Sequence, residues 1–140
     1  MDEELRQWIV SEAKTWLRTP YHHQGRIKGA GVDCAQFLVD VYFQCGLIPD
    51  LHITDYPHDW HLHRDEEKYL SWVEKYAHEI DLPIVQPGDI CLYQFGRVIS
   101  HGVIVVKWPI VIHSYINVGV ETTDATKHPL AGRLRKVYSL

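Results

Sequence analysis

The fold is decided by residues 25–46, which read GRIKGAGVDCAQFLVDVYFQCG. A glycine-rich turn opens this stretch, and the apolar residues after it predict a helix from about Asp33 to Cys45. Asp33 is expected to cap the start of the helix, and Gly46 is expected to end it. Cys34 then lies in the first helical turn, where unpaired backbone N–H groups and the positive end of the helix dipole favour an anion. We therefore expect its thiol to ionise readily and to be a candidate nucleophile.

Two histidines later in the chain lie in strand-like segments and are candidates to work with Cys34. If the segments on either side of Lys107 form a hairpin, facing positions have numbers that sum to about 214, and His101 and His113 become direct cross-strand neighbours. In a thiol hydrolase the sulfur attacks a carbonyl, an imidazole takes the thiol proton, and a third polar group fixes the tautomer of that imidazole. Cys34, His101 and His113 fit these roles in that order. Backbone N–H groups at the helix start would stabilise the oxyanion.

These residue types also have ordinary structural roles. The chain contains ten histidines, so a cysteine and a histidine can be paired by chance, and a histidine in a strand is often a packed residue. The three cysteines are widely spaced, which fits neither a disulfide framework nor a CxxC metal site. Cys45 and Cys91 are expected to be small buried apolar residues, whereas Cys34 is set apart by the glycines before it and by the helix end.

The remaining pattern predicts an α+β fold in a single domain that spans residues 1–140. Apolar residues at helical spacing predict helices over residues 2–17 and 65–80. The C-terminal part reads as strands, which are expected at residues 89–95, 100–106, 109–115, 118–122 and 133–138. Basic and apolar residues alternate in the last of them, which is therefore expected at a sheet edge. We expect the N-terminal helices to pack on one side of a C-terminal antiparallel sheet of about five strands.

Composition and charge exclude several classes of function. The net charge is −4 with neutral histidines, and because nucleic-acid-binding domains usually carry a basic surface, we expect no nucleic-acid partner. No apolar segment is long enough to span a bilayer, so we expect no membrane association. Residues Met1 to Glu4 form no basic region ahead of an apolar stretch, which predicts synthesis in the cytoplasm without a signal peptide.

A histidine-rich segment invites a metal interpretation; its members are His52, His58, His61 and His63. Zinc sites need ligands at fixed spacing on rigid elements, and this segment reads as a loop. We therefore expect no metal and no cofactor, and we interpret the segment as a flap near the active-site groove. Tyr56 and Trp60 are its candidate contacts.

Several sequence boxes around these residues resemble the NlpC-type cell-wall peptidases, which are papain-like cysteine peptidases. In chain order the boxes are Thr19-Pro20-Tyr21 leading to Gly31-Val32-Asp33-Cys34, Pro87-Gly88-Asp89-Ile90, Ser100-His101-Gly102-Val103-Ile104 and Val111-Ile112-His113-Ser114. The resemblance implies that Cys34 is the nucleophile, His101 the base and His113 the residue that orients the base. It also implies that Tyr21 places its hydroxyl at the active site and that Asp33 binds the amine end of a stem peptide. Alternatively, Tyr21 is a loop aromatic packed on the core, and Asp33 is only a helix cap.

The same resemblance implies hydrolysis of amide bonds in peptidoglycan stem peptides, after a D-γ-glutamyl residue and through an acyl-enzyme. The chain departs from many members in reading Asp-Cys-Ala-Gln instead of Asp-Cys-Ser-Gly, and His-Gln-Gly instead of Trp-Gly-Gly. The string from His23 to Arg26 is similar to the branch found with phage tails, which implies phage tail proteins as partners and a location in the virion or tail. Two alternatives stay open: a tail-assembly subunit with weak or no activity, and a thiol acyltransferase on the same scaffold.

Overall fold

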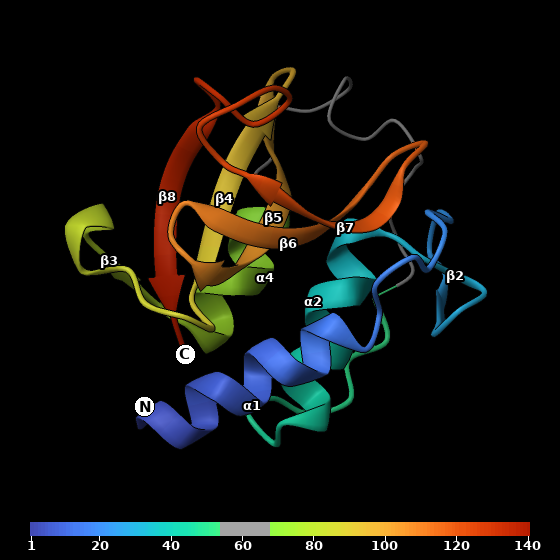
Figure 1. Cartoon of the computed structure of the whole chain (residues 1–140), viewed down its shortest axis with the longest axis horizontal. Coiled ribbons are helices and arrows are strands. Elements are labelled where there is room, and N and C mark those ends of the chain that lie inside the picture. The colour runs from blue at the N-terminus through green and yellow to red at the C-terminus, as the bar shows by residue number, and fades with distance from the viewer. Residues whose placement is uncertain (54–67) are drawn as a thin grey trace.

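The centre of the computed structural model, which describes residues 1–53 and 68–140, is a six-stranded antiparallel sheet with the order β3-β8-β4-β5-β6-β7 (Figure 1). Its strands are β3 (His78–Ile80), β4 (Ile90–Phe95), β5 (Val98–Lys107), β6 (Ile110–Tyr115), β7 (Gly119–Asp124) and β8 (Leu134–Ser139). A short 3-10 helix, η1 (Leu82–Ile84), precedes β4. Two further strands, β1 (Arg26–Ile27) and β2 (Gly31–Val32), form a small hairpin in the glycine-rich turn. The expected α+β class is confirmed.

The sheet has six strands instead of five because the end of the second predicted helix is a strand. Helix α4 spans Lys68–Tyr76, and β3 follows it and pairs with the C-terminal half of β8. Three residues are too few to show an alternating pattern. The helical periodicity of the preceding residues therefore extended the predicted helix to residue 80. The same pairing places β8 between β3 and β4, and the prediction of an edge strand was wrong. Residues 65–67, the predicted start of that helix, lie outside the described residues.

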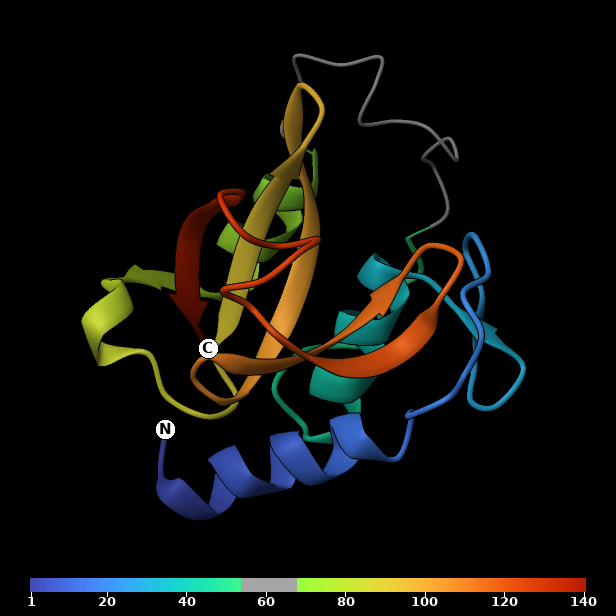
Figure 2. The ribbon, with the colours of Figure 1, turned by 45° about the horizontal axis from the view of Figure 1, so that its top comes forward.

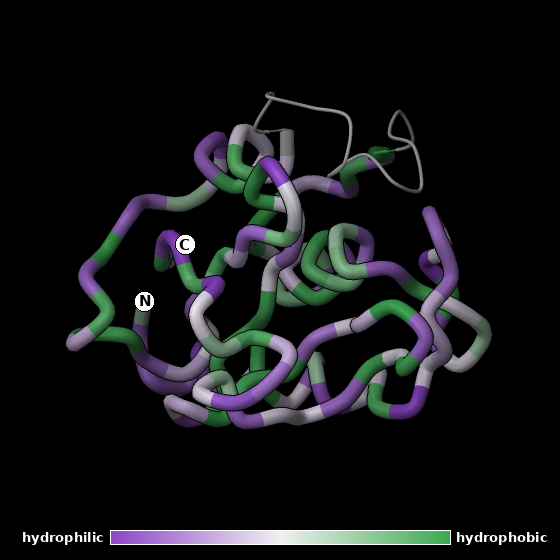
Figure 3. Tube along the Cα trace, turned by 90° about the horizontal axis from the view of Figure 1, so that it is seen from above, coloured by the Kyte–Doolittle hydropathy of each residue, from purple (hydrophilic) through white to green (hydrophobic). Residues whose placement is uncertain are grey.

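Helices α1 (Glu3–Lys14), α2 (Cys34–Gln44) and α4 all pack on one face of the sheet, as expected (Figure 2). They share one apolar cluster with the strands, whose members include Ile9, Phe37, Leu38, Tyr69, Ile104 and Ile112. A second cluster lies on the opposite face and includes Cys91, Tyr93, Val103, Val111 and Leu130. Figure 3 shows hydrophobic stretches of the chain passing through the middle of the molecule. Among the described residues, every helix is too short or too polar to cross a membrane.

Helix α2 begins and ends as the sequence predicts. The Asp33 side chain accepts the Gln36 N–H at 2.9 Å, which caps the first turn. Gly46 takes a φ of +74°, and the N–H of Leu47 returns to the Tyr42 carbonyl at 3.0 Å, which closes the last turn. Most of the helix is buried between α1 and the sheet, so its first turn is held firmly against β5.

The β5–β6 hairpin differs by two residues from its predicted register. The observed pairs Ile104–Ile112 and Val105–Val111 have numbers that sum to 216 instead of 214, and a bulge follows at Lys107. The prediction that His101 and His113 are direct cross-strand neighbours was therefore wrong. A shift of two residues leaves both side chains on the same face, because side chains alternate along a strand. The two histidines are diagonal neighbours on that face.

Candidate active site

Cys34 lies where the first turn of α2 meets β5. Its Sγ lies 3.6 Å from the Ser100 carbonyl oxygen, and the backbone N–H of Gly102 hydrogen-bonds to the sulfur. Ser100 and Gly102 flank His101, so the sulfur packs against the part of β5 that carries the predicted base. Only 7% of Cys34 is exposed. The structure therefore brings the candidate nucleophile to the strand of the candidate base.

The ionisation of this thiol differs from the sequence prediction. Burial raises the pKa of Cys34, and the neighbouring Asp33 carboxylate raises it further. The N–H groups of Gly102 and Cys34 and the hydroxyl of Tyr69 lower this pKa, but they do not offset burial. The expectation of a readily ionised thiol was wrong, because the depth at which α2 is buried depends on packing that the helix-end argument ignores. The resting group is a protonated thiol, and attack on a carbonyl requires a neutral base.

Two neutral imidazoles, on β5 and β6, form a hydrogen-bonded chain. The Nε2 of His101 and the Nδ1 of His113 lie 2.8 Å apart, and the Nε2 of His113 lies 3.0 Å from the Oε2 of Glu121. Burial lowers the pKa of His101, and the neighbouring His113 lowers it further. Burial also lowers the pKa of His113, although the hydrogen bond and charge of Glu121 act in the opposite direction. Near neutral pH both rings are therefore uncharged, and His101 can accept a proton.

Aromatic rings surround the two imidazoles. Tyr115 stacks on His113 with ring centres 5.4 Å apart, and Phe95 meets His101 edge-on at 5.5 Å. The ring of Tyr93, directly opposite on β4, lies 6.5 Å from His101. These rings exclude water from the imidazoles and hold them in place, which is the physical origin of their lowered pKa.

Tyr21 and Asp33, the candidate substrate-binding residues, are both close to Cys34. Burial raises the pKa of the Tyr21 hydroxyl, and the charges of Cys34 and Asp33 raise it further, so that hydroxyl lies within electrostatic range of both. Asp33 is 1% exposed, and its two oxygens accept the backbone N–H groups of Gln36 at 2.9 Å and Gln24 at 2.7 Å. Its role as a helix cap is confirmed. Substrate binding by either residue stays a prediction.

Two residues at the site were missed by the sequence analysis. The Tyr69 hydroxyl of α4 donates to the Cys34 carbonyl at 3.1 Å, and a Cβ on Gly102 would lie only 2.5 Å from that hydroxyl. Helical periodicity places Tyr69 on an apolar face and gives no sign of this contact. Glu121 lies directly opposite His113 in the β6–β7 hairpin. The sequence signal for this pairing is the turn between the two strands, where Asn117 has a φ of +64° and sets their register.

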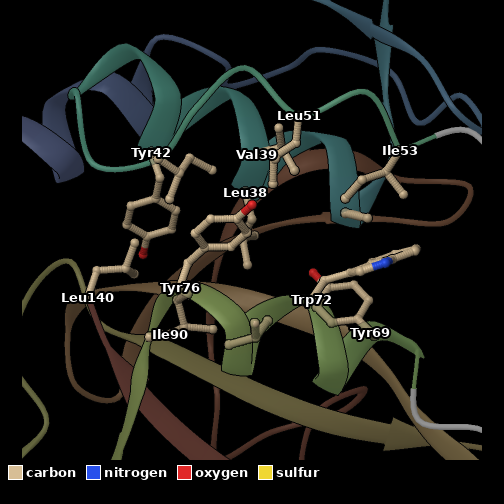
Figure 4. A pocket seen from close by; sticks show the side chains of 14 residues that line it. Leu38, Val39, Tyr42, Leu51, Ile53, Tyr69, Trp72, Tyr76, Ile90 and Leu140 are labelled. Atoms are coloured by element: carbon tan, nitrogen blue, oxygen red, sulfur yellow. The ribbon is translucent and has the colours of Figure 1, made fainter.

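Two hollows lie near the site, and they differ in polarity. A cleft of about 370 Å³ is lined by Pro20, Tyr21, His22, His23, Ile116, Asn117 and Val118. An apolar cavity of about 50 Å³ lies between α2 and α4, where Figure 4 shows the side chains of both helices pointing into it. Because the cleft contains Tyr21 and is more polar than the apolar cavity, it is the better candidate for the approach of a peptide.

The described residues offer no metal site. In residues 1–53 and 68–140, no group of three or more His, Cys, Asp or Glu side chains is arranged to hold a metal ion. His52, the described member of the histidine-rich segment, is exposed and lies 3.6 Å from Asp50. The other members of the segment and its candidate contacts lie outside the described residues: Tyr56, His58, Trp60, His61 and His63. Cys45 and Cys91 are buried, as expected for structural cysteines.

Comparisons with known proteins agree on the fold. The model of the NlpC/P60 family matches residues 18–138. The chain is similar to the NlpC/p60 domain of the peptidoglycan hydrolase SagA, with 20% identity, a TM-score of 0.68, and coverage of 96% of this chain and 98% of that one. An NlpC/P60 family protein from Bacillus cereus ATCC 10987 is 18% identical with a TM-score of 0.70, over 94% of this chain and 39% of that one.

A third similar structure is named as a protein without catalytic activity. RipD from Mycobacterium tuberculosis, described as a non-catalytic NlpC/p60 domain protein adapted to peptidoglycan binding, is 9% identical with a TM-score of 0.62 and coverage of 99% of both chains. No curated protein sequence matches this chain. At these identities the solved structures establish the fold alone.

Proposed function

The chain belongs to the NlpC/P60 family, and we propose that it is a cysteine endopeptidase that hydrolyses amide bonds in peptidoglycan stem peptides. The observation that carries this proposal is the hydrogen-bonded pair of His101 and His113, with His101 on the stretch of β5 whose backbone contacts the Cys34 sulfur. A neutral imidazole beside a protonated thiol is the pair that general-base activation of a nucleophile requires. The bond after a D-γ-glutamyl residue is the proposed target, supported by the resemblance of the boxes that contain Tyr21 and Cys34.

The proposed reaction uses these residues in two steps. As Sγ of Cys34 attacks the carbonyl carbon, His101 takes the thiol proton, and backbone N–H groups at the start of α2 stabilise the oxyanion. His101 then gives this proton to the leaving amine, the C–N bond breaks, and a thioester remains on Cys34. In the second step His101 takes a proton from the water that attacks the thioester, the C–S bond breaks, the acyl group leaves as a carboxylic acid, and His101 returns the proton to the sulfur. His113 orients the imidazole of His101 throughout.

We further propose that the Tyr21 cleft receives the stem peptide, with the Tyr21 hydroxyl in contact with the substrate. Asp33 is proposed as the partner of the amine end, through its charge beside the same hydroxyl. The resemblance of the string from His23 to Arg26 supports a protein that is carried by a phage tail, with tail proteins as its partners.

A second candidate function is a peptidoglycan-binding or tail-assembly subunit with weak or no activity. The raised pKa of the buried Cys34 favours this candidate, since a thiol that stays protonated is a poor nucleophile unless a base acts on it. The fold it shares with RipD, which is described as non-catalytic, points the same way. A thiol acyltransferase on the same scaffold would differ only in the acceptor of the thioester.

Mass spectrometry of purified muropeptides before and after incubation tests the proposal. We expect the wild type to convert each substrate into two products whose masses together equal the substrate plus one water, and Cys34→Ala and His101→Ala to release none. If the groups act as a unit, each loss amounts to about 10⁴-fold or more. Cys45→Ala, a change to a buried cysteine elsewhere, is the matched control and retains activity.

The outcomes separate the candidates. Equal product from wild type and Cys34→Ala would remove Cys34 from the mechanism. Absence of product from the wild type, together with sedimentation of both proteins with peptidoglycan, would favour the binding subunit. A product that carries an added amine instead of water would favour the acyltransferase.

A further inference from the structure

The hydrogen-bonded chain that begins at His101 continues past His113 to a carboxylate. Resting on the proposed function, we infer that Glu121 is a positioning residue that fixes the tautomers of both histidines and leaves Nδ1 of His101 as the proton acceptor. The geometry spans three neighbouring strands, with His101 on β5, His113 on β6 and Glu121 on β7.

Glu121 is placed for this role by the register of the sheet. It lies directly opposite His113 in the β6–β7 pairing, and its Oε2 is 3.0 Å from the Nε2 of His113. The side chain of His113 is 0% exposed and that of Glu121 is 35% exposed. The carboxylate therefore keeps contact with water while it anchors a ring that has none.

The positions of the protons follow from the chemistry of each partner. An ionised carboxylate only accepts hydrogen bonds, so the Nε2 of His113 must carry the proton of that ring. A neutral imidazole carries one N–H, so the Nδ1 of His113 is bare and can only accept. The facing Nε2 of His101, 2.8 Å away, must then donate. The remaining nitrogen of His101, its Nδ1, is therefore unprotonated and free to receive the thiol proton.

This chain of tautomers depends on both rings being neutral. Among the described residues, the titratable groups in contact with the pair are Tyr93 from β4, Tyr115 from β6 and Glu121 from β7, and Arg133 stacks at 4.6 Å over Phe95, which meets His101 edge-on. A proton added to His113 would make its Nδ1 a donor to His101. The tautomer of His101 would then reverse, its Nδ1 would carry the proton, and the base would be lost.

Nitrogen-15 NMR of the histidine side chains tests the inference directly. In the wild type we expect the Nε2–H tautomer at both His101 and His113. Glu121→Leu removes the acceptor, and we expect a mixture of tautomers at His113 and a kcat/KM lower by roughly 10- to 100-fold, as for other groups that orient a functional histidine. Glu121→Gln keeps an acceptor oxygen but also offers a donor, so its effect is intermediate. Glu79→Gln, which alters an exposed strand glutamate paired with Lys136, is the matched control.

The pH profile provides a second readout that a purely structural role would not move. The carboxylate raises the pKa of His113, so its removal lowers that pKa and shifts the acid limb of kcat/KM to lower pH. Unchanged tautomers in folded Glu121→Leu, or an Nδ1–H on His113 of the wild type, would overturn the inference. If the wild type hydrolyses nothing, the proposed function fails, while the NMR result still decides the role of Glu121.

Discussion

Two buried polar clusters in the described part of this sheet differ in how their hydrogen bonds end. The first joins α1 to the start of β4, where Nη1 of Arg6 lies 2.8 Å from Oδ1 of Asp89 and 3.0 Å from the Pro87 carbonyl oxygen. The second oxygen of Asp89 accepts the Gln86 N–H at 2.9 Å. Asp89 is 0% exposed, so a full charge is buried here and balanced by an opposite charge. The two charged groups of this cluster are therefore paired with each other and with neighbouring backbone groups.

The second cluster, His101 with His113, is open at both ends. One end reaches the half-exposed Glu121, and the other lies on the strand against which Cys34 packs. Both imidazoles are uncharged, and their hydrogen bonds leave the Nδ1 of His101 without a proton. Burial alone therefore does not mark a functional residue. A buried ion pair whose partners are all satisfied supports the fold, whereas a chain of neutral groups that ends beside a nucleophile can move a proton.

The largest expected effect separates the two clusters by stability. Asp89→Asn removes the charge that balances Arg6 and leaves a buried guanidinium unpaired, which should lower the free energy of unfolding by about 3–5 kcal/mol. Under conditions where the variant is folded, its kcat/KM should equal that of the wild type. Urea denaturation followed by circular dichroism measures the first, and muropeptide hydrolysis the second. If Asp89→Asn lowers the activity but leaves the stability unchanged, the proposed difference between the two clusters is wrong.

Gly102→Ala tests whether the contact of β5 with α2 and α4, next to the second cluster in sequence, tolerates crowding. The new Cβ would lie 2.5 Å from the Tyr69 hydroxyl and 3.0 Å from Cδ2 of Leu38, so α4 or β5 must shift. We expect a loss of about 1–3 kcal/mol in stability and a lower kcat, because the N–H of residue 102 then moves away from the Cys34 sulfur. The matched control is the double variant with Tyr69→Phe, which removes the clashing hydroxyl. If the double variant is no more stable than Gly102→Ala alone, the strain arises from another contact.

The third prediction concerns pH and distinguishes a neutral thiol from a preformed ion pair. Burial raises the pKa of Cys34, so below that pKa its thiolate fraction grows about tenfold for each pH unit. In a variant with Cys45→Ala and Cys91→Ala, alkylation by iodoacetamide should accelerate steadily across roughly pH 6 to 9. A thiolate–imidazolium pair would instead give a rate independent of pH over this range. Such a plateau would refute the protonated resting thiol.

Local signals explain why much of this site is predictable from the sequence. Asp33 and Gly46 fix the ends of α2 by capping, and a register whose position numbers sum to an even value places His101 and His113 on one face. Their register was wrong by two residues because the turn lies at Trp108 and Pro109, between the paired Lys107 and Ile110, and not at Lys107. The predicted direction of the shift in the Cys34 pKa was wrong because that shift depends on burial in the folded protein.

Tyr69→Phe is expected to have the smallest effect on stability, and it tests how a neighbouring hydroxyl changes the pKa of the Cys34 thiol. The hydroxyl donates to the Cys34 carbonyl at 3.1 Å and lowers the pKa of the thiol. Its removal should cost about 0.5–1.5 kcal/mol, the usual net value of one hydrogen bond. It should also raise the thiol pKa further and slow alkylation at a given pH. Tyr76→Phe, on the same helix, is the matched control. Faster alkylation of Tyr69→Phe than of this control would mean that the hydroxyl shields the sulfur more than it stabilises the thiolate.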